Sequence, residues 1–167
     1  MEKKVKGNAT EYILDGPLSE RSQLFEQPIP KTLNQEIRIN MEQVTSINSI
    51  GVKSWILWTS QIPRTVKLTL ERCPYVVINQ VNMIHGFIPD HTIIESFFAP
   101  FVCESCDYET VQLVSLGKEY VYASGSTPMS IKSPMEFSCD KCGQSLAPDF
   151  FYDKIFAFLN KRKAVKI

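Results

Sequence analysis

The chain has 167 residues, enough for one ordinary domain or two small ones and too few for a large catalytic fold. Its 44% hydrophobic and 22% charged residues can fill a packed core, which excludes a disordered chain. Eighteen Lys and Arg residues balance eighteen Asp and Glu residues, so the chain lacks the overall basic field of a general nucleic-acid binder. We find no signal-peptide pattern and no apolar run near the ~20 residues that span a bilayer, and therefore expect a cytoplasmic protein without membrane association.

The first hundred residues predict alternating strands and helices. Apolar and polar residues alternate over 11–17, 36–41, 65–70 and 92–98, which predicts four strands. Apolar residues recur at helical spacing over 49–62 and 75–86, and Pro63 and Gly86 should end these two helices. Between residues 18 and 35, Pro28 and Pro30 leave only a short helical turn and loop. This order implies crossover connections and an α/β sheet with packed helices.

The stretch Ile37–Val52, with its turn Asn48-Ser49-Ile50-Gly51-Val52, resembles the signature of STAS domains, the fold of bacterial anti-sigma-factor antagonists. In that family a strand precedes a turn of the form Asp-Ser-Ser/Thr-Gly-Leu, which opens a helix. The resemblance covers about residues 5–102 and implies a STAS-like mixed sheet in residues 1–100. It further implies a non-enzymatic bacterial regulatory or scaffold module whose partner is a protein, such as an anti-sigma factor or a sensor-kinase-like protein.

The turn departs from the family pattern at two positions. The family's third motif residue is a Ser or Thr that a partner kinase phosphorylates, whereas this chain has Ile50, which cannot take a phosphate. Asn48 replaces the acidic residue of the motif. We expect Asn48 and Ser49 to act as ordinary helix-capping residues, with phosphorylation of Ser49 as the alternative.

The helix predicted over 49–62 is apolar on much of its circumference. Ile50, Leu57 and Trp58 lie opposite the stripe formed by Val52, Trp55 and Ile56. Both sides should therefore be covered, either by the C-terminal part of the same chain, which we favour, or by a partner protein. The residues expected to bind such a partner are Asn48, Ser49, Ile50, Leu57 and Trp58.

Four of the five cysteines form two Cys-x-x-Cys pairs, Cys103 with Cys106 and Cys139 with Cys142. Two such turns facing each other provide the tetrahedral thiolate environment that zinc prefers, so we predict a structural Zn²⁺ with no open position for catalysis. A redox pair would need to begin a helix after a strand, and local disulfides are rare in a reducing compartment. The region resembles a zinc ribbon, in which strands at 109–114 and 119–122 are expected to form a hairpin.

After the cysteines, an amphipathic helix is predicted to start at Pro148, with its apolar stripe on Phe150, Phe151, Ile155, Phe158 and Leu159. Residues 101–167 would then form a zinc-ribbon-like unit with a C-terminal helix. No catalytic grouping is visible, so we expect no enzyme. The alternative function is a nucleic-acid-associated zinc-ribbon protein, which the low lysine content of residues 103–142 disfavours.

Overall fold

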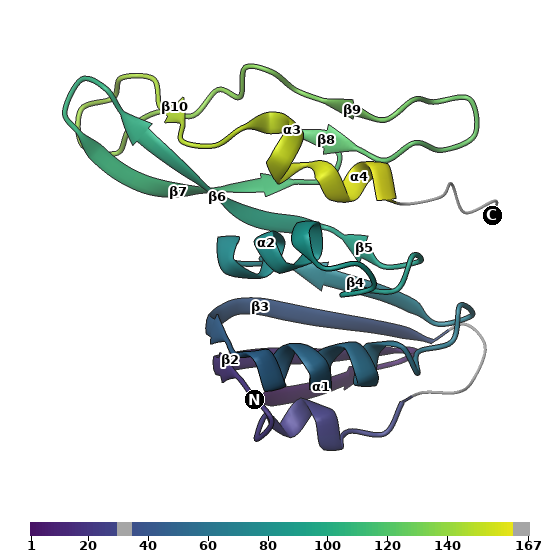
Figure 1. Cartoon of the computed structure of the whole chain (residues 1–167). Helices are drawn as coiled ribbons and strands as arrows, with labels where there is room; N and C mark the ends of the chain where they lie inside the picture. Colours follow the sequence, from purple (N-terminus) through teal and green to yellow (C-terminus); the bar gives the residue numbers. More distant parts are fainter. Residues whose placement is uncertain (30–34, 162–167) are drawn as a thin grey trace.

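The computed structural model describes residues 1–29 and 35–161 and shows a mixed α/β protein. Its larger sheet has five strands in the order β1-β2-β3-β4-β5 (Figure 1). The strand β1 pairs antiparallel with β2, and the remaining neighbours are parallel. Their bounds are β1 Glu2–Lys6, β2 Ala9–Leu18, β3 Glu36–Ile47, β4 Lys67–Glu71 and β5 Ile93–Ile94.

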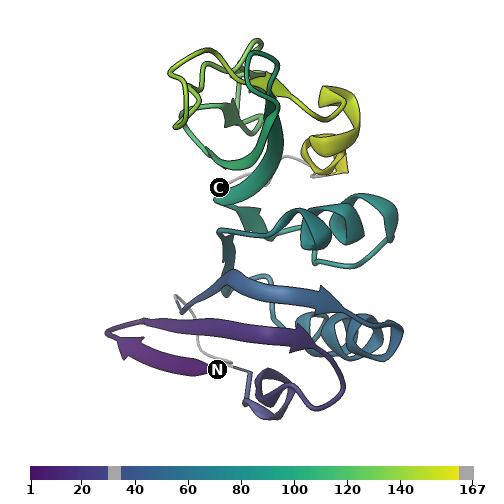
Figure 2. The same ribbon diagram turned by 90° about the vertical axis from the view of Figure 1, so that its left-hand side faces the viewer.

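Two helices form the crossovers between the parallel strands, as the order of elements predicted. The helix α1 (Ser49–Thr59) joins β3 to β4, and α2 (Tyr75–Met83) joins β4 to β5. Both lie on the same face of the sheet (Figure 2). In β3 the residues that face the helices, Ile37, Ile39 and Met41, are fully buried. The polar residues between them lie on the opposite face, so the sheet has one packed and one polar face.

Both helices end earlier than predicted. After Thr59 the chain tightens into three-residue turns, in which the Gln61 amide donates to the Trp58 carbonyl at 3.3 Å and the Ile62 amide donates to the Thr59 carbonyl at 3.0 Å. At the end of α2, Ile84 is already extended and Gly86 has a φ of 76°. Among the described residues, no helix is long and apolar enough to cross a membrane.

A second sheet carries the C-terminal part. The strand β6 (Ser96–Cys103) pairs antiparallel with β7 (Tyr108–Ser115) on one side and with β10 (Ala147–Pro148) on the other. The expected hairpin of 109–114 with 119–122 is therefore wrong: β7 pairs with β6, and β8 (Tyr120–Val121) pairs with β9 (Ser130–Ile131). The apolar alternation of β6 continues to Cys103 beyond the expected end at residue 98, so the boundary expected at residue 100 falls within this strand.

The single C-terminal helix is also corrected. Pro148 belongs to β10, and two short helices follow, α3 (Tyr152–Ile155) and α4 (Ala157–Lys161). Phe156 interrupts them, and its buried ring lies 5.4 Å from that of Phe97. Asn82 on α2 donates hydrogen bonds of 3.0 and 2.9 Å to the carbonyl groups of Lys154 and Ile155. The C-terminal helices therefore pack on α2 (Figure 1).

One continuous apolar core joins the two parts. Phe97 at the start of β6 contacts the rings of Tyr120, Phe156 and Phe158, at centroid distances of 5.4 to 5.9 Å. Cys73, which forms a bridge with Phe97, is fully buried, as expected for a small apolar residue in the core. Burial raises the pKa of its thiol, so this cysteine stays protonated.

Candidate metal centre

The first cysteine pair occupies the turn between β6 and β7. Cys103 ends β6 and pairs with Tyr108, the first residue of β7. The amide of Cys106 donates to the carbonyl of Cys103 at 3.3 Å, which closes the turn. Asp107 has a φ of 53°, a left-handed conformation that Asp tolerates better than most residues. These features put both thiols on one tight turn.

The second pair lies on a similar turn. The amide of Cys139 donates to the carbonyl of Gln144 at 2.7 Å, and that of Gly143 donates to the carbonyl of Cys139 at 2.8 Å. Gly143 has a φ of 75°, which explains the glycine after Cys142. The backbone N–H of Lys141 points at the Cys139 sulfur, 3.4 Å away, and such a donor stabilises a thiolate.

Strand β10 holds the two turns together. It follows the second turn directly and pairs with Phe101 and Val102, the residues just before Cys103. The ring of Phe101 packs edge-on against those of Phe137 and Phe150, at centroid distances of 5.0 and 5.5 Å. Backbone pairing and aromatic packing thus position both turns independently of any ligand.

The four sulfurs meet in one cluster, as the sequence predicted. The distance from Cys103 Sγ to Cys142 Sγ is 3.4 Å, that from Cys106 Sγ to Cys139 Sγ is 3.7 Å, and all four sulfurs lie within 4.8 Å of one another. Four sulfurs at ~2.3 Å from a tetrahedral metal lie about 3.8 Å apart, so the arrangement fits such an ion. No two sulfurs are bonded, and all five cysteines are free thiols.

The environment of the cluster favours at least one thiolate. Burial opposes ionisation of Cys103, but hydrogen bonds from Cys142 and from the Ser105 and Cys106 amides outweigh it and lower the pKa of Cys103 to about 7. Partial desolvation of the Cys106 sulfur among the other three thiols, together with hydrogen bonds to them, raises the pKa of Cys106 to about 12 although the residue as a whole is exposed. Cys103 and Cys139 are buried, whereas Cys106 and Cys142 are exposed. A metal ion therefore has an entry path from solvent and would displace the remaining thiol protons.

The second candidate site lies at the start of α1. The side chain of Asn48 accepts a hydrogen bond of 2.6 Å from the amide of Gly51, which confirms the predicted N-cap. Asn48 and Ser49 are exposed, as are Ile50 and Leu57 at 55% and 56%. These four residues share the accessible side of α1.

Trp58 does not belong to this accessible side. Its side chain is only 3% exposed, its indole N–H donates to the Gln27 carbonyl at 3.1 Å, and its ring packs edge-on against Tyr12. The segment around the short helix η1 (Gln23–Glu26) covers this part of α1. The expectation that the C-terminal part covers α1 is wrong, because that part packs on α2. The sequence predicted only a short helical turn and loop here, and its apolar residues Leu24 and Phe25 were the one sign that this segment packs on the core.

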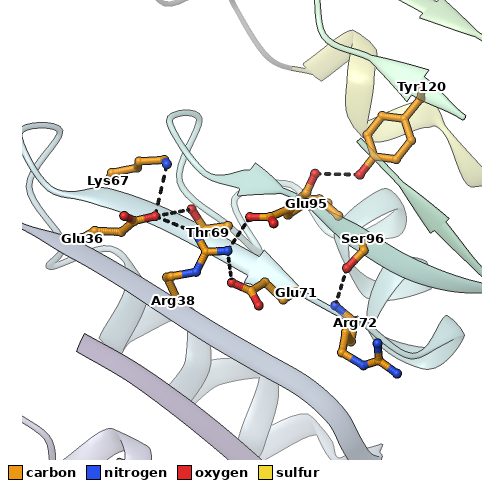
Figure 3. A network of polar contacts seen from close by, with 10 residues as sticks. Glu36, Arg38, Lys67, Thr69, Glu71, Arg72, Glu95, Ser96 and Tyr120 are labelled. Carbon is orange, nitrogen blue, oxygen red and sulfur yellow. Dashed lines mark hydrogen bonds and ion pairs between the residues drawn. The ribbon is translucent and has the colours of Figure 1, made fainter. Parts of the chain in front are cut away.

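A polar cluster on the open face of the sheet was not anticipated (Figure 3). Arg38 binds Glu36 at 2.9 Å and Glu95 at 2.6 Å, and it also pairs with Glu71. Lys67 adds a contact of 3.1 Å to Glu36. Burial raises the pKa of Glu71 even though Arg38 opposes this shift. The cluster ties β3 and β4 to the residue after β5, a structural role that the period-two polar positions of β3 could have indicated.

Comparisons of the chain with protein-family models, with curated proteins and with solved structures find no match. The functional interpretation therefore comes from the chemistry of these residues.

Proposed function

We propose that the chain is a non-enzymatic bacterial regulatory or scaffold module that binds a protein partner through a STAS-like N-terminal part. The observation that carries this proposal is the accessible start of α1, where apolar side chains are exposed next to the capping turn. The elements from β3 to β5 follow the order that the resemblance implies, and the turn stands between β3 and α1.

The proposed partner surface is small and specific. Ile50 and Leu57 are seven residues apart and therefore lie on the same side of α1, two turns from each other. Lys53, which is also exposed, lies between them. This pattern fits an apolar groove on the partner with an acidic group near its middle. Because Ile50 stands at the family's phosphoacceptor position, we propose that binding is not switched by phosphate there.

The experiment that tests this role replaces the exposed apolar residues. The variant I50D/L57D should lose the partner in cross-linking from native cells, while its melting temperature stays close to that of the wild type, since exposed substitutions rarely change stability by more than ~0.5 kcal/mol. Met83→Asp is the matched control, because Met83 is 80% exposed on the neighbouring helix. Equal capture by I50D/L57D and wild type would contradict the proposed surface.

We propose that the metal of the cysteine cluster is Zn²⁺ and that its role is structural. Four thiolates fill the tetrahedral positions of the ion and leave none for a substrate. Elemental analysis of protein purified without added metal should give one zinc per chain, and Cys139→Ser should lower this content. Protein that is stable, monomeric and free of any metal would contradict the assignment.

The nucleic-acid alternative has less support. Residues 103–142 contain three lysines, Lys118, Lys132 and Lys141, and Lys132 pairs with Glu136 at 3.0 Å. The Lys141 ammonium lies 4.0 Å from the ring centroid of Tyr108. Fluorescence anisotropy with labelled single-stranded RNA and duplex DNA tests this function directly. Tight, salt-dependent binding that falls in K132A/K141A would replace the protein-binding proposal.

A further inference from the structure

The outer strand of the second sheet has a free edge. There β7 pairs with β6 alone, and no further strand among the described residues lies on its other side. In an antiparallel pair, alternate residues direct their backbone groups toward the neighbouring strand and the others direct them away from it. The Pro100 carbonyl accepts from the Asp149 amide, just after β10, at 3.0 Å, so the register partner of Pro100, Val111, faces away from β6. The N–H and C=O groups of Glu109, Val111 and Leu113 therefore lie along the free edge.

This free stretch ends where the chain supplies a partner of its own. Ser115 is the next outward-facing residue, and its amide donates to the Glu119 carboxylate at 2.8 Å. No such contact is found within the described chain for the outward groups of Glu109, Val111 and Leu113. Three successive outward-facing residues are thus available to pair with an added strand.

The other sheet edges of the molecule are protected in ways that β7 is not. The outer strand of the larger sheet, β1, carries Lys3, Lys4 and Lys6, and its opposite edge, β5, has only two residues. The edge strand β10 is equally short and contains Pro148. Lysine, proline and short length are the usual devices that prevent pairing at a sheet edge. Strand β7 has eight residues without lysine or proline, so its edge is open to another chain.

An open apolar face adjoins this edge. In β6 the alternate residues from Phe97 to Cys103 are buried, so their neighbours lie on the opposite face of the sheet. The register of β6 with β7 places five partly or largely exposed apolar residues on that outer face: Phe98, Pro100, Val102, Val111 and Leu113. Val111, at the edge, is 54% exposed. A strand added to β7 would extend this apolar face, provided that its own side chains on that side are apolar.

The charge at one end of the edge selects a basic residue. Glu109 is the one charged residue of β7, and it is exposed, as are Glu104 and Asp107 in the adjoining turn. No ion pair in the described part of the chain involves these three carboxylates. A second copy of β7 would bring no basic residue to Glu109, whereas a lysine or arginine on another protein would complement it.

We propose that the edge of β7 binds an extended segment of a partner protein, which adds to the sheet as an antiparallel strand. Its residues opposite Leu113 and Val111 are apolar, and its residue opposite Glu109 is lysine or arginine, in the order apolar-x-apolar-x-basic. In this mode of recognition the backbone hydrogen bonds provide affinity, and the alternate side chains provide specificity. The surface is separate from α1, so the proposal is independent of the partner surface described above.

The test titrates a capped peptide, Thr-Val-Thr-Val-Thr-Lys-Thr, into the metal-loaded, ¹⁵N-labelled full chain. In the free protein the amides of Glu109, Val111 and Leu113 should exchange with solvent faster than those of Thr110 and Gln112, which donate to β6. The peptide should shift the three outward amides saturably and slow their exchange. Replacing the peptide lysine with glutamate should weaken binding by about 2- to 5-fold, and less at high salt.

Matched peptides separate strand pairing from apolar adhesion. N-methylation of the two peptide valines removes two N–H groups that face β7 and should weaken binding by about 10-fold or more. N-methylation of the two threonines that lie between the valines and the lysine modifies groups that face away, and should have little effect. These peptides leave the protein unchanged, so their comparison does not depend on the folding of any variant.

Val111→Pro tests the same bond from the protein side. It removes an N–H that does not donate to β6, and proline is tolerated on edge strands, so the melting temperature should stay close to that of the wild type. Peptide binding should fall by about 3- to 10-fold, whereas Val111→Thr, which keeps the N–H, should retain most of it.

Three results would overturn the proposal. The first is a peptide that leaves the three outward amides unchanged, and the second is equal binding of the valine-methylated and unmodified peptides. The third is protection of these amides that rises with protein concentration in the absence of peptide, together with a doubled mass in analytical ultracentrifugation, because the edge would then belong to a second copy. Equal binding of the lysine and glutamate peptides would overturn the choice of a basic partner residue.

Discussion

Removal of the metal should destabilise the chain by an amount that the positions of the cysteines determine. A bound ion connects two turns whose close sulfur pairs are 33 and 39 residues apart in sequence. Without the ion, the unfolded chain regains the freedom of that loop. The backbone pairing of β6 with β10 and the packing around Phe101 remain available to the metal-free protein.

The loop length gives the magnitude. Closing a loop of this size with a cross-link is worth about 4 kcal/mol in chain entropy. For a protein of this length, a loss of 1 kcal/mol lowers the melting temperature by about 2–4 °C, so we expect a fall of about 8–16 °C. Additional native-state disorder around the turns would increase this value, and strain in the metal-bound cluster would reduce it.

Calorimetry measures the fall in melting temperature, and amide hydrogen exchange shows which segments lose protection. The samples are the purified metal-loaded protein, the same protein after chelation, and Cys139→Ser. In the chelated protein and in Cys139→Ser, the amides of segment 137–146, β8 and β9 should lose protection from hydrogen exchange. The amides of β3 and β4 should remain protected. Cys73→Ala is the control: Cys73 lies outside the cluster, so this variant should keep its metal even though it loses core packing.

A melting temperature that changes by less than about 2 °C on complete metal removal would refute the cross-link reasoning. Simultaneous loss of protection in β3 and β4 would refute it as well, because the effect would then extend through the whole fold rather than through one loop.

Three further predictions concern single contacts. Gly51→Ala should destabilise the chain by about 1–3 kcal/mol or more in urea denaturation, because a Cβ atom there would lie 2.1 Å from the carbonyl oxygen of Leu18. Tyr120→Phe should cost about 1 kcal/mol, since its hydroxyl donates to the Ile94 carbonyl at 2.6 Å and Tyr122 at 3.4 Å replaces it only in part. Hydrogen bonds from Arg72 lower the pKa of Glu42 below 4.5, so this pair stabilises the fold above pH 4.5 and loses its effect as the pH falls through the lower, folded-state value. The difference in urea midpoint between wild type and Arg72→Gln should therefore be constant from pH 6 to 8 and shrink under acidic conditions, and a difference that is independent of pH would contradict the pairing.

Local patterns were sufficient where neighbouring residues decide the structure. The crossover helices, the strands β2, β3 and β4 and the cap at Asn48 follow from periodicity and from the preference of Asn for the N-cap, whereas β1 was not predicted and the strand expected over 92–98 is divided between β5 and β6. The metal-ligand set followed from spacing alone, because a tight turn brings cysteines three residues apart to one side. Each helix, cap and cysteine turn depends on contacts within a few residues, whereas the meeting of the two cysteine turns, 33 and 39 residues apart by their close sulfur pairs, does not.

Pairings between distant segments could not be predicted in this way. The segment 109–114 alternates equally well for a hairpin with 119–122 or for pairing with β6, and only the apolar continuation of β6 to Cys103 decides between them. Phe156 lies outside the predicted helical stripe, and its ring, which is buried against Phe97, divides the helix. Trp58 is covered by the segment around η1, about thirty residues earlier in the chain, a contact that no local pattern encodes.

Strand β6 connects the metal centre to the rest of the fold. At its first residue, the Ser96 carbonyl accepts from the Cys73 amide at 3.0 Å, and the Ser96 hydroxyl accepts from the Arg72 amide at 2.9 Å. At its last residue, Cys103 supplies a sulfur to the cluster, and eight residues of extended strand span about 26 Å. The end at Ser96 is thus held by the larger sheet, and the end at Cys103 would be held by an ion bound to the cysteine cluster. We therefore expect metal removal to reduce exchange protection progressively along β6, most at Cys103 and least at Ser96. Equal loss at both ends would mean that the strand moves as one unit, in which case a bound metal would also control the packing of Phe97 against Phe158.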